Sequence, residues 1–126
     1  MMPTGWLATG GFLLILAFYL IMALSSLTRE ETRLAIARMT ELGVPMPVFS
    51  FWFGLTLQFA GIALLAAGWH ADVGVYLLIF STVTASAIFH RFWNMQDPFR
   101  RAVSRRMLFH NMAIVGGLLL VLHQVL

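Results

Sequence analysis

The chain has 126 residues, enough for one domain, and it contains no cysteine, which excludes disulfide bonds and thiolate metal sites within it. Hydrophobic residues make up 60% of the chain and charged residues only 10%. A soluble protein of this size would need more polar surface, so the composition predicts a single integral membrane domain over residues 1–126. The net charge of +3 comes from two arginine-bearing segments, which indicates membrane topology and not nucleic-acid binding.

Four apolar stretches are long enough to cross a bilayer, because a helix needs about 20 residues to span a hydrocarbon core of about 30 Å. We expect these spans at about residues 5–27, 48–68, 73–92 and 107–125. The predicted fold class is therefore all-α, a four-helix transmembrane bundle. The first stretch lacks a basic start, and Ser25-Ser26 is a poor cleavage site, so we expect this helix to be retained and not removed as a signal peptide.

The connection between the first two spans predicts a short amphipathic helix on the membrane surface, at about residues 29–42. Thr28 followed by Glu30 and Glu31 is typical of a helix N-terminus, and Gly43 followed by two prolines indicates the end of this helix. A solvated connector is the alternative interpretation of the same segment.

The other two connections differ in length. The link at residues 70–72 is so short that the second and third spans should form a tight antiparallel hairpin. Residues 94–105 are interpreted as a polar loop before the fourth span, in which Asp97-Pro98 starts a turn or caps a short helix.

The eight basic residues, all arginine, lie in or beside the first and third connections. The head at residues 1–4, the short link and the tail contain none. By the positive-inside rule the arginine-bearing side is cytoplasmic. We therefore expect a multi-pass protein of the bacterial inner membrane, with both termini outside the cytoplasm.

Polar residues inside the predicted spans need a partner in protein, water or a ligand. In the second span, one helix face carries Ser50, Gly54, Gln58 and Gly61, with Gln58 near the bilayer midplane. The glycines on this face would allow another helix or a flat ligand to approach closely.

A second polar stripe runs along the third span and ends in the segment from Phe89 to Pro98. Its members are Thr82, Ser86, His90 and Trp93 or Asn94. Asn111 lies about five residues into the fourth span, beside His110. His90, Asn94 and Asn111 are therefore expected at similar depth, near the cytoplasmic face.

Two interpretations of these polar residues stay open. In the structural one, they form hydrogen bonds between helices and hold the bundle together. In the functional one, they line a pocket at the cytoplasmic interface, walled by Phe89, Phe92, Trp93 and Phe109. Such a pocket suits a quinone or a lipid, which needs a few hydrogen bonds at one end and apolar walls along the rest. The predicted binding residues are then His90, Trp93, Asn94, Asn111, Gln58 and Ser86.

Heme is a further alternative, because neutral imidazoles on neighbouring helices can ligate its iron. His90 and His110 are the candidate ligands, but His90 lies close to the membrane edge, and we do not favour heme. We expect no non-heme metal site, because no carboxylate accompanies the histidines inside the spans. No paired carboxylates or nucleophile motif is present, so we do not expect an enzyme that works on its own.

Four segments together resemble the DoxX-like family of small membrane proteins. They are Glu41-Leu42-Gly43-Val44-Pro45-Met46-Pro47, the stretch from Gly54 to Gly68, Phe89-His90-Arg91-Phe92-Trp93-Asn94-Met95, and Phe109-His110-Asn111-Met112-Ala113 with Gly116-Gly117. The resemblance covers about residues 41–121. It implies a four-helix bundle linked to quinone-dependent membrane oxidoreductase assemblies, with His90, Trp93 and Asn111 at the family's polar positions. Gln58 departs from the glutamate usual in the family, and an amide cannot release a proton.

We therefore expect a small integral membrane subunit of a larger membrane complex. Its function would be linked to redox or electron-transfer chemistry, with a quinone or lipid site at the cytoplasmic side. The expected partners are other membrane subunits and lipids, in a homo- or hetero-oligomer. Two alternatives stay open: a quinone- or heme-dependent oxidoreductase subunit that acts directly, and a purely structural accessory subunit of a respiratory or photosynthetic complex.

Overall fold

The computed structural model describes residues 5–126, and the arginine-free head expected at residues 1–4 lies outside them. Within the described chain the elements are α1 (Trp6–Ser25), α2 (Arg29–Glu41), α3 (Pro47–Ala67), α4 (Ala71–Phe89), the short 3-10 helix η1 (Phe92–Asn94) and α5 (Pro98–Val125). Four of these helices, α1, α3, α4 and α5, are long and apolar enough to cross a membrane. The predicted all-α bundle of four long apolar helices is confirmed.

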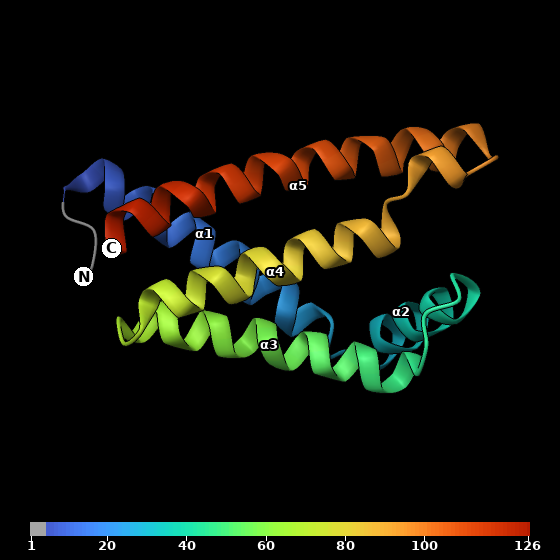
Figure 1. Cartoon of the computed structure of the whole chain (residues 1–126), viewed down its shortest axis with the longest axis horizontal. Helices are drawn as coiled ribbons and strands as arrows, with labels where there is room; N and C mark the ends of the chain where they lie inside the picture. Colours follow the sequence, from blue (N-terminus) through green and yellow to red (C-terminus); the bar gives the residue numbers. More distant parts are fainter. Residues whose placement is uncertain (1–4) are drawn as a thin grey trace.

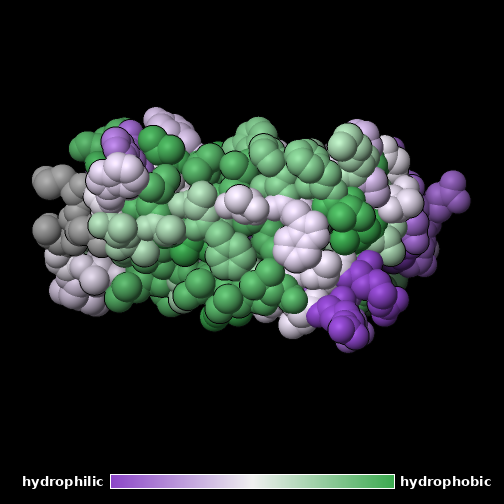
Figure 2. All heavy atoms as spheres, turned by 90° about the horizontal axis from the view of Figure 1, so that it is seen from below, coloured by the Kyte–Doolittle hydropathy of each residue, from purple (hydrophilic) through white to green (hydrophobic). Residues whose placement is uncertain are grey.

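The four long helices run roughly along one axis, and α2 lies at one end of them (Figure 1). We call this end, which carries α2, η1 and the start of α5, the basic end. The beginning of α1, the end of α5 and the link between α3 and α4 lie at the opposite end (Figure 1). Figure 2 shows a hydrophobic middle and a concentration of hydrophilic side chains at the basic end. The two arginine-bearing segments thus share one end, as the topology prediction requires.

Helix α2 has the ends that its sequence predicts. The hydroxyl of Thr28 accepts a hydrogen bond from the backbone N–H of Glu31 at 3.3 Å. At the other end the N–H of Val44 donates to the carbonyl oxygen of Met39 at 3.0 Å, and Gly43 adopts a φ of 77°. This is the bonding pattern of a Schellman motif, in which glycine tolerates the left-handed conformation. The turn redirects the chain into α3.

The predicted polar loop at residues 94–105 is wrong, because α5 already begins at Pro98. Proline suits the first position of a helix, and the carboxylate of Asp97 accepts a hydrogen bond from the N–H of Arg100 at 3.0 Å. The guanidinium of Arg101 donates two further bonds to the carbonyl oxygen of Met95, at 2.7 and 3.0 Å. The first turns of α5 are rich in arginine, so hydropathy alone placed the start of the helix nine residues too late.

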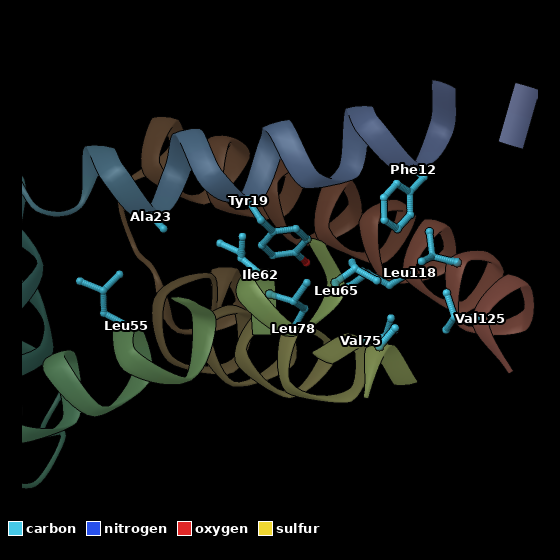
Figure 3. Close-up of a cluster of buried hydrophobic side chains, with 12 residues drawn as sticks. Phe12, Tyr19, Ala23, Leu55, Ile62, Leu65, Val75, Leu78, Leu118 and Val125 are labelled. Atoms are coloured by element: carbon cyan, nitrogen blue, oxygen red, sulfur yellow. The ribbon is translucent and has the colours of Figure 1, made fainter. Parts of the chain in front are cut away.

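Side chains from all four long helices meet in one buried core (Figure 3). Its members are Phe12, Tyr19, Ala23, Leu55, Ile62, Leu65, Ala71, Val75, Leu78, Leu118, Val121 and Val125. Figure 3 shows Phe12 and Tyr19 pointing from α1 toward the side chains of the other helices. The Tyr19 hydroxyl is hydrogen-bonded to the hydroxyl of Thr82, which also donates to the carbonyl oxygen of Leu78 at 2.8 Å. This bond ties α1 to α4 inside the core.

In the hairpin, α3 and α4 approach each other most closely at two glycines, Gly61 and Gly74. A Cβ atom added at Gly61 would lie 2.9 Å from the carbonyl oxygen of Gly74, and one added at Gly74 would lie 2.8 Å from that of Gly61. The two backbones therefore touch, which only glycine allows. From this contact the helices diverge toward the basic end (Figure 1). The close approach expected at Gly61 is confirmed, whereas Gly54 on the same face meets nothing within 4 Å.

We predict that Gly74→Ala lowers the free energy of unfolding by about 1–3 kcal/mol, because its Cβ would press on backbone atoms that cannot move aside. Gly116→Ala is the matched control, since its Cβ would meet nothing within 4 Å. The control should be neutral or slightly stabilising, by up to about 1 kcal/mol, because alanine favours helix. Thermal unfolding in detergent measures both variants, and equal melting temperatures would contradict the close contact.

Candidate ligand-binding groove

Where α3 and α4 diverge, a groove of about 420 Å³ opens between them and α2. Its walls are largely apolar and include five phenylalanines: Phe49, Phe51, Phe53, Phe80 and Phe89. Small residues on both helices leave its space open, with Gly54 on α3 and Ala85 on α4. The groove therefore follows from the geometry of the hairpin, which is tight at the two glycines and wide at the basic end.

Two polar side chains in the groove have hydrogen-bonding capacity that the protein does not use. The amide nitrogen of Gln58 donates to the carbonyl oxygen of Tyr19 at 3.4 Å, and its amide oxygen accepts no bond from residues 5–126. The hydroxyl of Ser81 is buried and has no hydrogen-bond partner in the same part of the chain. Leaving a buried hydroxyl unpaired costs about 1–3 kcal/mol, and a ligand in the groove recovers this free energy only if the Ser81 side chain turns toward it.

The sequence predicted one wall of this groove and missed the other. Ser50, Gly54 and Gln58 were expected on one face of the second span, and all three line the groove. Ser81 was not expected, because the polar stripe of Thr82 and Ser86 lies on a different face of the helix. The available signal was the spacing of four between the small residues Ser81 and Ala85, which places a second small-residue face on this helix.

Ser86 and Asn111 meet in the bundle, away from the groove. The side-chain amide of Asn111 on α5 donates to the hydroxyl of Ser86 on α4 at 2.8 Å. Both residues are at least partly buried. Such a bond between two membrane helices supports the structural interpretation of this pair, since each group satisfies the other inside the apolar region.

His90, Trp93 and Asn94 lie at the end of α4 and in η1. The side chain of Trp93 is 59% exposed, and His90 is partly buried, with its backbone N–H bonded to the carbonyl oxygen of Ser86 at 3.0 Å. Asn94 lines a second cavity at the basic end. Of the six predicted binding residues, only Gln58 belongs to the groove. A binding role for the other five stays a prediction.

The two candidate heme ligands occupy different environments. His90 is partly buried at the end of α4, whereas His110 is exposed on α5. Among residues 5–126 no three histidines or acidic residues lie close enough together to hold a metal ion. The arrangement offers no observation in favour of heme binding within this chain.

Comparison of the chain with protein-family models, with curated proteins and with solved structures gives no match. The resemblance to the DoxX-like family therefore stays a prediction from the four sequence segments. The function has to be argued from the groove and its surroundings.

We predict that Ser86 and Asn111 are energetically coupled. A double-mutant cycle of Ser86→Ala and Asn111→Ala should give a coupling energy of about 0.5–2 kcal/mol, typical of a hydrogen bond between membrane helices. The control cycle pairs Asn111→Ala with Thr56→Ala, whose hydroxyl bonds only within its own helix to Trp52. Unfolding in detergent measures both cycles, and additive effects in the first would show that the bond does not hold the helices.

Proposed function

We propose that this protein is a small integral membrane subunit of a larger assembly, and that it holds one amphipathic membrane molecule, a lipid or a quinone, in the groove between α2, α3 and α4. The single observation that carries the proposal is the groove itself. Its volume of about 420 Å³ lies in the range of about 300–1,000 Å³ typical of small-molecule sites. Apolar walls with a few free polar groups suit a molecule with a long hydrocarbon chain.

The position of the groove favours a ligand that enters from the bilayer. Three of its aromatic side chains, Phe49, Phe53 and Phe80, are more than half exposed, at 60%, 53% and 57%. In a membrane this rim would face lipid and not water. If the basic end is cytoplasmic, as the positive-inside rule indicates, the groove lies in the cytoplasmic half of the bilayer.

A link to redox chemistry belongs to the same proposal and depends on the sequence resemblance. Gln58 and Ser81 offer an amide and a hydroxyl, which could bond the carbonyl oxygens of a quinone headgroup. The chain supplies binding and orientation only, because redox chemistry would come from a cofactor or a partner subunit. The proposed role is thus that of an accessory subunit and not of a complete enzyme.

A purely structural role is the second candidate, and the hydrogen bonds between helices favour it. Tyr19 with Thr82 and Ser86 with Asn111 join helices inside the bundle without any ligand. If this candidate is right, the groove is filled by whatever bilayer lipid is present, with no preference for one molecule. The two candidates therefore differ in whether a defined molecule stays bound after purification.

We predict that Gly54→Leu expels the bound molecule. A leucine at Gly54 projects into open space that belongs to the groove, so the helix can accept it while the ligand loses its place. The chain is extracted in mild detergent, and the lipids and quinones that remain per chain are measured by mass spectrometry. The amount of the retained molecule should fall by about tenfold or more.

The matched control is Gly116→Leu, which also adds a leucine in open space but on α5, outside the groove. This variant should retain the molecule as the unmodified chain does. Two results would contradict the proposal. In one, both variants retain the same amount of the molecule as the unmodified chain; in the other, no defined molecule is retained by any of the three proteins. Circular dichroism confirms that both variants keep their helices.

A further inference from the structure

A second cavity, of about 370 Å³, lies at the basic end beside the groove. It is enclosed by the last turn of α2, the end of α4, the segment around η1 and the first turn of α5. Unlike the groove, it is lined by charged groups. Five of its lining residues are charged: Arg38, Arg91, Arg100, Glu41 and Asp97. We call this cavity the arginine pocket.

Both carboxylates of the arginine pocket already have partners. Glu41 forms an ion pair with Arg38 at 3.0 Å, and Asp97 caps α5 by accepting the backbone N–H of Arg100. Within residues 5–126 the side chains of Arg91 and Arg100 form no ion pair. The three arginines and two carboxylates of the pocket leave one positive charge in excess, and neither Arg91 nor Arg100 is held in an ion pair within the described residues.

Arg91 shows the strongest sign of a missing partner. Its Nε atom is buried, and no atom of residues 5–126 accepts a hydrogen bond from it. A buried donor on a cation is costly unless an acceptor reaches it, and an anion gives the most favourable bond. The guanidinium fork also matches phosphate geometry better than a lysine would. An anionic oxygen in the pocket can bond the guanidinium group of Arg91, and it reaches the buried Nε only after the side chain turns toward the pocket.

Ile88 lines both the arginine pocket and the groove, so the two cavities are neighbours at this side chain. A single molecule with an anionic head and an apolar chain could therefore occupy the two cavities together. Quinones carry no charge and would leave the arginines unmatched. Basic pockets beside membrane helices commonly bind the phosphate of anionic lipids.

We propose that the arginine pocket binds the phosphate headgroup of an anionic membrane lipid whose hydrocarbon chain lies in the groove. This inference rests on the proposed function and narrows its ligand from lipid or quinone to a lipid phosphate. Arg91 and Arg100 bind the phosphate, and the hydrocarbon chain lies along the apolar walls of the groove.

The test uses the delipidated full chain in detergent and native mass spectrometry. The chain is titrated with phosphatidylglycerol, with zwitterionic phosphatidylcholine and with a quinone. We expect phosphatidylglycerol to bind most tightly. Arg91→Gln and Arg100→Gln should each weaken its binding by about tenfold, because each removes a charged hydrogen bond. Binding of the quinone should not change, since it does not reach the pocket.

Arg106→Gln is the matched control, because it removes one arginine from α5 outside the pocket. It should change phosphatidylglycerol binding by no more than about twofold, as expected for an exposed charge. Circular dichroism checks that each variant is folded. If folded Arg91→Gln and Arg100→Gln bind phosphatidylglycerol as the unmodified chain does, the inference is overturned.

Two further outcomes separate the possible ligands. Millimolar inorganic phosphate should not displace the lipid, because inorganic phosphate has no hydrocarbon chain to occupy the groove. Displacement would show that the pocket binds a soluble phosphate, and it would overturn the lipid assignment. If quinone binds the groove while phosphatidylglycerol shows no preference, the proposed function stands and only this inference fails. If the unmodified chain binds neither, both fail.

Discussion

The backbone contact between Gly61 and Gly74 determines the shape of this bundle. α3 and α4 touch at these two glycines near the short link and diverge toward the basic end (Figure 1). The groove, its apolar walls and its position beside α2 all follow from this one crossing. The proposed binding function therefore depends on the close packing of α3 against α4 at these two glycines.

Polar groups in the described chain fall into two classes that have different consequences. Tyr19 is hydrogen-bonded to Thr82, and Ser86 to Asn111, across helix interfaces, so these two pairs stabilise the bundle. Ser81 and the Nε of Arg91 are buried without a partner. They line adjoining cavities, one apolar and one charged. A ligand in either cavity can supply the missing bond once the side chain turns toward it.

The sequence predicted the four spans because apolar length is sufficient evidence for a membrane helix. It also predicted α2, since Thr28 and Gly43 are strong local signals for helix ends. It missed the early start of α5 because arginine-rich turns at the end of a span lower the hydropathy without breaking the helix. The cap at Asp97 and Pro98 was recognised, but the length of the helix that follows was not.

The site was predicted less well, for a geometric reason. Depth along a helix can be counted from the sequence, and Asn111 was expected level with His90 and Asn94, but its hydrogen-bond partner is Ser86, about one turn before His90 on α4. The direction in which a residue faces depends on how each helix is rotated in the bundle, and the sequence pattern did not determine this. Ser81 and Ser86 are only five residues apart, yet one lines the groove and the other faces α5. The meeting of Arg38, Arg91 and Arg100 likewise depends on tertiary contacts between α2, α4 and α5.

The most direct measurement is photo-crosslinking in reconstituted vesicles, with an anionic phospholipid that carries a diazirine in its acyl chain. Peptide mass spectrometry then locates the labelled residues. If the groove holds the lipid, labelling is concentrated on the groove walls, in residues 49–58 of α3 and 80–89 of α4. It should exceed the labelling of ordinary lipid-facing positions such as Leu14 and Leu120, whose side chains are 74% and 70% exposed. Uniform labelling of every exposed apolar position would contradict it, because the groove would then hold lipid no more firmly than the rest of the surface.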